Sequence, residues 1–198
     1  MVRDELDVLE QQGETGADSV LALFARCRRL AEGLSTGEGQ RVYSSHKLDA
    51  LDCIRTAYKG RLVVASELLD SLTAIEDRLD HTYRLDGKVK DKTSVLDAWK
   101  SSEDGVLVVN PQVAATAVDM READVLVWYG VPTSALTYRQ MSDRVALAAD
   151  PKVIVLVTQD TVEDSLWSSL AEATEFRKEI MLNTRDFLLG ETYASESV

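Results

Sequence analysis

Few residues of this chain combine the type and spacing that a catalytic or metal site requires. The two histidines, His46 and His81, lie far apart, and neither has a Cys or His partner at the spacing of a zinc site. The Gly-Lys step at Gly87-Lys88 is followed by Val89 and lacks the earlier glycine of a phosphate-binding loop, Gly-x-x-x-x-Gly-Lys-Ser/Thr. These patterns argue against a metal enzyme and against a self-sufficient nucleotide site.

Chemistry is expected instead where polar residues follow apolar strands. Short runs rich in Val and Leu alternate with helical patterns, which predicts an α/β fold with an open parallel sheet of about five strands flanked by helices. The predicted strands are Leu62–Ser66, His81–Leu85, Val106–Asn110, Asp124–Tyr129 and Val153–Thr158. The predicted helices between and after them are Glu67–Leu79, Lys90–Lys100, Thr133–Ala149 and Thr161–Leu182.

Ligands of open α/β sheets bind at the carboxyl ends of the strands. The predicted strands therefore place four segments on one candidate functional edge. These segments are Ser66–Glu67, Asp86–Gly87, Asn110–Ala117 and Gly130–Thr133.

An α-helical N-terminal extension precedes the sheet. From Asp18, apolar residues recur at three-four spacing, with Arg26, Arg28 and Arg29 assigned to the opposite, polar side. A second helix is expected over Ser45–Tyr58. Cys27 and Cys53, which lie in these two helical patterns, are both predicted to be small buried residues.

The composition indicates one globular domain in a reducing, cytoplasmic setting. The 198 residues are 45% hydrophobic, without an apolar run of the roughly 20 residues that cross a membrane. The net charge of −12 disfavours tight autonomous DNA binding and favours basic partners. We expect an acidic start and helical extension over residues 1–44, the main domain over 45–183 and a flexible tail over 184–198.

An ordered series of short segments resembles the second RecA-like lobe of Swi/Snf-type superfamily 2 helicases and translocases, in the phage or bacterial form. The resemblance runs from about His46 to Glu172. The segments that carry it are HKLDALDCI, RLVVASELLDSLTAIEDRL, YRLDGKVKDKTSVLDAW, VLVVNP, YRQMSDRVALAAD and TVEDSLWSSL. The resemblance implies a RecA-like sheet and a role in DNA transactions.

The segment after VLVVNP departs from the family pattern. The family has a glycine-rich turn there that ends in Asn, which lets the backbone approach phosphate closely. The positions here are Ala114, Ala115, Thr116, Ala117, Val118 and Asp119. Added methyl groups and a carboxylate at this turn would oppose phosphate binding.

The helix carrying YRQMSDRVALAAD departs as well. The family has two arginines three residues apart, which stabilise charge on the transferred phosphoryl group. Arg144 is retained together with Gln140, but Leu147 stands at the second arginine position. Arg144 alone either contacts a phosphate or forms an ordinary surface ion pair with Asp143 or Asp150.

The resemblance implies two sets of candidate site residues. Gln140 and Arg144 would be catalytic only with a partner lobe. Candidates for nucleic-acid binding are Arg84, Lys88, Lys90, Ser66, Asn110 and Thr116. The basic run among them is either a DNA-facing edge or a solvated loop. Trp99, Trp128 and Trp167 either stack on bases or pack in the core.

Three functions follow from these patterns. The first is an isolated, catalytically degenerate lobe that acts by binding DNA weakly, a Walker-containing lobe, or a host or replication protein. The second is half of a split ATP-dependent DNA helicase, completed by a separate Walker-containing chain. The third is an acidic regulator that occupies a basic partner. No cofactor is expected for the chain alone, and ATP and Mg²⁺ only with a partner lobe. No association with membranes is expected.

Overall fold

The computed structural model describes residues 17–35, 42, 44–114, 118–145 and 152–171. Its helices are α2 (Ala17–Ala31), α3 (His46–Ala57), α4 (Leu69–Arg78), α5 (Lys92–Ser101), α6 (Pro111–Ala114), α7 (Ala135–Val145) and α8 (Val162–Ala171). Its strands are β1 (Leu62–Ala65), β2 (Thr82–Leu85), β3 (Val106–Val109), β4 (Val125–Trp128) and β5 (Lys152–Val155). None of the described helices has the length and apolar content that a bilayer crossing requires.

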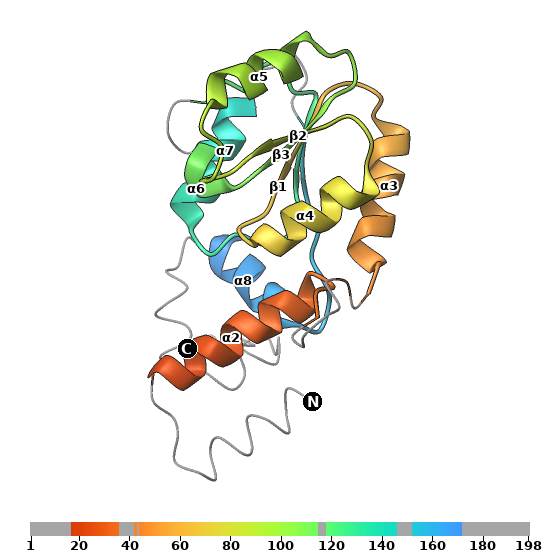
Figure 1. Ribbon diagram of the computed structural model, residues 1–198. Coiled ribbons are helices and arrows are strands. Elements are labelled where there is room, and N and C mark those ends of the chain that lie inside the picture. The colour runs from red at the N-terminus through yellow and green to blue at the C-terminus, as the bar shows by residue number, and fades with distance from the viewer. Residues whose placement is uncertain (1–16, 36–41, 43, 115–117, 146–151, 172–198) are drawn as a thin grey trace.

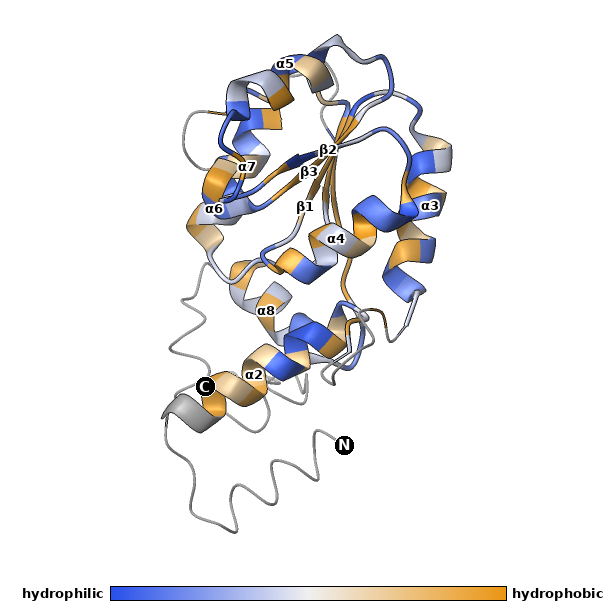
Figure 2. Cartoon of the chain, viewed as in Figure 1, coloured by the Kyte–Doolittle hydropathy of each residue, from blue (hydrophilic) through white to orange (hydrophobic). Residues whose placement is uncertain are grey.

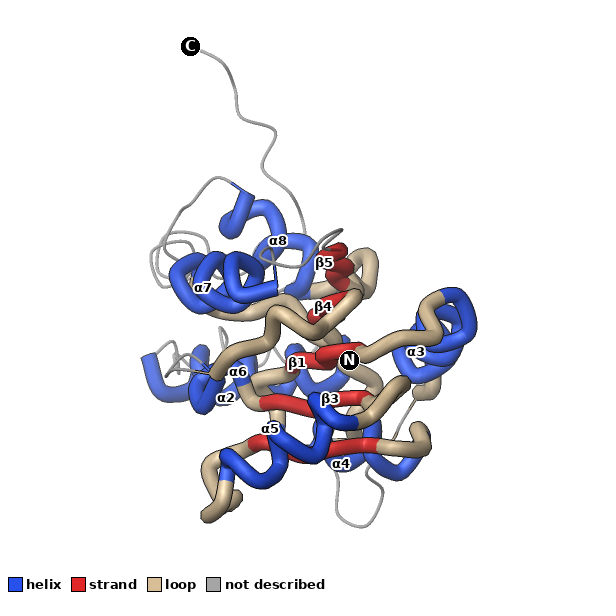
Figure 3. The backbone as a smooth tube through the Cα atoms, turned by 90° about the horizontal axis from the view of Figure 1, so that it is seen from above, coloured by secondary structure: helices blue, strands red, loops and turns tan. Residues whose placement is uncertain are grey.

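The five strands form one parallel sheet in the order β2-β3-β1-β4-β5 (Figure 1). This confirms the expected open parallel sheet. Helix α4 follows β1 on the face that α3 also covers, whereas α5, α6 and α7 cover the other face (Figure 3). The neighbouring strands β1 and β4 therefore send their following helices to opposite faces. Their carboxyl ends form the crevice where ligands of such sheets bind.

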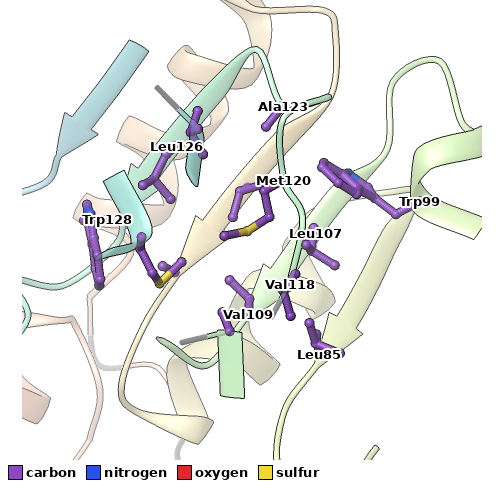
Figure 4. Packing of buried hydrophobic residues seen from close by; sticks show 14 residues of the cluster. Leu85, Trp99, Leu107, Val109, Val118, Met120, Ala123, Leu126 and Trp128 are labelled. Atoms are coloured by element: carbon purple, nitrogen blue, oxygen red, sulfur yellow. The ribbon is translucent and has the colours of Figure 1, made fainter. Parts of the chain in front are cut away.

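Both faces of the sheet are buried, which is why its central strands are continuously apolar. Alternate residues of β1 face opposite sides: Val63 packs with Trp99 of α5, and Val64 packs with Leu72 of α4. All four residues of β1, β3 and β4 are buried, and the labelled strands in the centre of Figure 2 are mostly hydrophobic. On the α5–α7 face, Met120 lies between the strands and Trp99 (Figure 4).

The N-terminal helix belongs to the fold of the domain. Leu23, Phe24 and Cys27 of α2 share a buried cluster with Val162 and Leu166 of α8. In Figure 1, α2 lies below α4 and α8, at the end of the molecule toward which β1 runs. This helix therefore covers the carboxyl edge of the sheet.

Two predictions about this region were wrong. Arg28 is 6% exposed, because its guanidinium binds groups of the sheet edge rather than solvent. Cys27 is buried as predicted, but Cys53 on α3 is exposed, because it lies off the apolar stripe of its helix. The short helix α6 was not among the predicted helices.

Candidate functional site

The polar residues that follow β1, β3 and β4 come together at the carboxyl edge. The Glu67 carboxylate accepts hydrogen bonds from the backbone N–H and the hydroxyl of Thr133, at 3.1–3.3 Å. Asn110 donates through Nδ2 to the Glu67 carbonyl at 3.2 Å and accepts from the Gln112 N–H. Ser66, which is 1% exposed, donates to Glu32 at 2.9 Å. The predicted site residues Ser66 and Asn110 thus lie close together, with intramolecular partners.

Helix α2 and the residue that directly follows it supply two charged side chains to this edge. The Arg28 guanidinium donates to Glu67 Oε2 at 2.8 Å and to the Val131 carbonyl at 3.0 Å, so it bridges the segments after β1 and β4. One turn later, Glu32 Oε2 accepts from Ser66 and from Ser71 Oγ at 2.6 Å. Arg28 and Glu32 therefore lie across the carboxyl ends of β1 and β4.

A second buried ion pair lies beside the first. Lys47 Nζ is 2.6 Å from Glu163 Oε2 and also donates to the carbonyls of Tyr129 and Leu156. Glu163 accepts in addition from the Thr158 N–H at 2.8 Å. Lys47 and Glu163 lie within HKLDALDCI and TVEDSLWSSL, two segments of the resemblance, but neither was predicted as a site residue, and Arg28 and Glu32 lie outside those segments. The available signal was charged residues within otherwise apolar helical patterns.

The candidate catalytic residues lie on α7. Gln140 is exposed, and Arg144, one turn later, is partly buried. Arg144 Nη1 donates to the Val118 carbonyl at 2.7 Å, which ties α7 to the segment that follows α6. Leu147 lies outside the described residues, as do residues 115–117 with the candidate Thr116.

Asp119 is held by cations of its own surroundings. Its carboxylate accepts from Arg121 Nε and Nη2 at 2.9 and 2.7 Å and lies 3.6 Å from Lys100 Nζ. The hydrogen bonds from Arg121 are the main reason that the pKa of Asp119 lies well below its ordinary value. A full negative charge therefore stands next to Val118, beside the position of Arg144.

The basic run at the end of β2 divides into two parts. Arg84 is paired with Glu76 at 2.6 Å and with Asp86 at 2.8 Å. Burial by itself would raise the pKa of Asp86, but the Lys88 N–H and Arg84 outweigh it and hold that pKa below its ordinary value. Lys88 and Lys90 are exposed. Arg84 therefore stabilises its own loop, and the two lysines form the cationic surface of this edge.

The tryptophans divide in the same way. Trp99 and Trp128 are fully buried, and Trp99 Nε1 donates to the Gly105 carbonyl at 3.1 Å. Trp167 on α8 is 37% exposed and packs edge-on against Tyr138, with ring centroids 6.0 Å apart. Core packing is thus the role of Trp99 and Trp128.

Several of these predicted site residues are engaged in contacts within the chain. One guanidinium nitrogen of Arg144 donates to the Val118 carbonyl. The neighbouring Asp119 carboxylate would repel a polyphosphate. Asn110 and Ser66 direct their side chains to intramolecular partners.

Comparisons with known proteins agree with this architecture. A family model described as "Helicase conserved C-terminal domain" matches residues 46–148. A comparison with curated protein sequences gives no match. Among solved structures, the SWI2/SNF2 ATPase core domain of Sulfolobus solfataricus is similar with a TM-score of 0.72 and 10% identity, over 95% of this chain and 45% of that chain.

Two further structures share the fold. The C-terminal part of the Fun30 ATPase domain has a TM-score of 0.56 and 20% identity, over 62% of this chain and 44% of that chain. The C-terminal domain of the DEAD-box protein Dbp5 has a TM-score of 0.56 and 14% identity, over 66% of this chain and 79% of that chain. The chain spans less than half of the Fun30 and Sulfolobus chains.

Proposed function

Because this chain belongs to the helicase conserved C-terminal domain family, with the RecA-like fold of a superfamily 2 second lobe, we propose that it is a catalytically degenerate lobe. It acts as a binding module in DNA transactions and does not hydrolyse ATP by itself. The 198 residues contain no Gly-x-x-x-x-Gly-Lys-Ser/Thr loop. A lobe of this kind works through a protein partner and through weak contact with DNA.

The observation that carries this proposal is the hydrogen bond from Arg144 to Val118. In a working phosphoryl-transfer site, an arginine of this helix must place its guanidinium on the transferred phosphate. Here one guanidinium nitrogen of Arg144 holds the carbonyl that precedes Asp119. The retained arginine thus serves the internal packing of α6 and α7, which is a role that an ATP-independent lobe can keep.

An ATPase assay tests the proposal. We expect the purified chain to show no hydrolysis above background, with or without single- or double-stranded DNA. Arg144→Ala is compared with Arg139→Ala, which removes an exposed arginine of the same helix. Hydrolysis that Arg144→Ala abolishes and Arg139→Ala leaves intact would overturn the proposal.

The partner is tested separately. The chain is purified from its native cells by affinity, and the eluate is analysed for DNA and for a Walker-containing protein. Recovery of either supports a binding module. Recovery of the chain alone, with no DNA shift at low salt, contradicts it.

One observation favours a second candidate function, the split helicase. Gln140 is exposed and lies one turn from Arg144, so both can face a lobe supplied by another chain. In that case the chain stimulates the ATPase of a Walker-containing partner, and Gln140→Ala and Arg144→Ala both reduce the stimulation. A partner whose ATPase is unchanged by the chain excludes this function.

A further inference from the structure

Five charged side chains from different parts of the chain meet where α2 crosses the carboxyl edge. Two are cations and three are carboxylates: Arg28 of α2, Glu32 directly after α2, Lys47 of α3, Glu67 after β1 and Glu163 of α8. Their side chains are 0–13% exposed. With every group ionised, this cluster carries one excess negative charge away from water.

Four of the five charges form two close pairs. Arg28 is 2.8 Å from Glu67, and Lys47 is 2.6 Å from Glu163. Glu67 and Glu163 each accept further hydrogen bonds from backbone N–H groups. These two pairs are therefore electrically balanced and well hydrogen-bonded.

Glu32 is the unmatched carboxylate. Its nearest cation is Arg28 Nη2 at 3.5 Å, too long for a strong ionic hydrogen bond. Glu32 Oε2 has only the hydroxyls of Ser66 and Ser71, and Glu32 Oε1 is buried without a hydrogen-bond partner. A buried charge with one bare oxygen is costly, whereas a carboxylic acid can share its proton with either serine.

The surroundings of Glu32 act together on its protonation. Burial is the largest influence and raises the pKa of Glu32. The positive charges of Arg28 and Lys47 oppose this rise, and the negative charge of Glu163 adds to it. The Tyr129 hydroxyl lies 3.4 Å from the Glu32 carbonyl. Burial, followed by the charges of Glu32 and Glu163, raises the pKa of Tyr129, so this phenol stays neutral.

We propose that α2 is a proton-dependent latch over the carboxyl edge of the sheet, and that one proton on Glu32 is required to hold it closed. When that proton is lost, the excess charge of the cluster loosens α2 from α4, α8 and the end of β4. The opening uncovers Ser66, Glu67 and Gly130, which line the crevice between β1 and β4. Exposure of this crevice is thereby coupled to pH.

The two free cysteines provide a direct measurement. Cys27 is a residue of α2 buried against α8, and Cys53 is exposed on α3. The rates at which methyl methanethiosulfonate labels them are measured by mass spectrometry from pH 5 to 9. The ratio of the Cys27 rate to the Cys53 rate largely cancels the pH dependence of the reagent and reports opening of α2.

In the wild type we expect the ratio to rise above the ordinary Glu pKa of 4.5, by up to about tenfold per pH unit, and to level off above the raised pKa of Glu32. Glu32→Gln, which mimics the protonated side chain, keeps the ratio low and flat. Glu76→Gln removes a carboxylate outside the cluster and keeps the wild-type profile.

His46, the first residue of α3, is another ionisable side chain near the end of α2, with Nε2 3.1 Å from the Ala31 carbonyl. The measurement is therefore repeated in the His46→Gln background, where the rise must persist. A flat wild-type ratio overturns the latch, whether or not the variants fold. A rise that survives Glu32→Gln or disappears in His46→Gln overturns the role of Glu32.

Discussion

The ammonium group of Lys47 lies 2.6 Å from a carboxylate oxygen of Glu163, although 116 positions separate the two residues in the sequence. Both side chains are almost completely withdrawn from solvent. Lys47 also donates to the carbonyls of Tyr129 and Leu156, so a single ammonium group joins α3, α8 and the ends of β4 and β5.

Removal of one partner of this pair should be strongly destabilising. Lys47→Met leaves the Glu163 charge buried and unpaired, so we expect a loss of about 3–5 kcal/mol in the free energy of unfolding by urea. Lys47→Met with Glu163→Leu should recover much of this loss, because no charge is then stranded. Arg78→Met breaks an exposed pair with Asp52 and should lower the free energy of unfolding far less. Equal losses at Lys47 and Arg78 would contradict the buried pair.

Gly130 should be required for α2 to dock. A Cβ atom on Gly130 would overlap the Glu32 carboxylate, so Gly130→Ala must displace Glu32 from the crevice. We expect faster proteolysis within α2 and lower stability. Gly87→Ala adds the same methyl group where no atom lies within 4 Å, and should leave α2 protected. Equal protection in the two variants would show that α2 tolerates the added atom.

Asp86 should contribute stability that depends on pH. Because its folded pKa is lowered, the contribution is fully present above the ordinary Asp pKa of 3.8 and is lost as pH falls through the lower folded value. Asp86→Asn should therefore be less stable than wild type at pH 7, and the difference should shrink below about pH 4. Urea unfolding at pH 7 and pH 3 checks this, with Asp97→Asn on the exposed side of α5 as control. A difference that is constant with pH would rule out the ionic role.

Any DNA binding should depend on Lys88 and Lys90 rather than on Arg84. Replacement of a phosphate-contacting lysine by Gln should weaken low-salt binding and reduce the salt slope, log K against log salt, by about 0.7–0.9. Arg84→Gln should instead lower stability, because Glu76 and Asp86 lose their partner. Lys59→Gln, an exposed lysine before β1, is the matched control in a fluorescence anisotropy titration. Equal effects at Lys59 and Lys88 would point to non-specific charge.

The order of the strands along the chain followed from local pattern. Val106–Val109 is apolar at every position, and only a strand covered on both faces accommodates four such residues in succession. The predicted strands ran one residue too far at Ser66, Asn110 and Tyr129 and three too far at Thr158. At Ser66 the backbone N–H still donates to the Val109 carbonyl, while the hydroxyl binds Glu32. The core position of Trp99 was predictable for the same reason, since it lies on the apolar side of its helix.

The sequence by itself determined a five-stranded α/β lobe and its resemblance to the second lobe of superfamily 2 helicases. Only the tertiary structure decided which charged side chains are buried and which groups they bind. Arg28 was assigned to a polar face because its burial depends on Glu67 and Val131, which are 39 and 103 positions away. The apolar pattern is a local property of each segment, whereas the partner of a charge is fixed by which strand ends meet. The fold therefore placed α2 in the crevice and left Glu32 as its unmatched carboxylate.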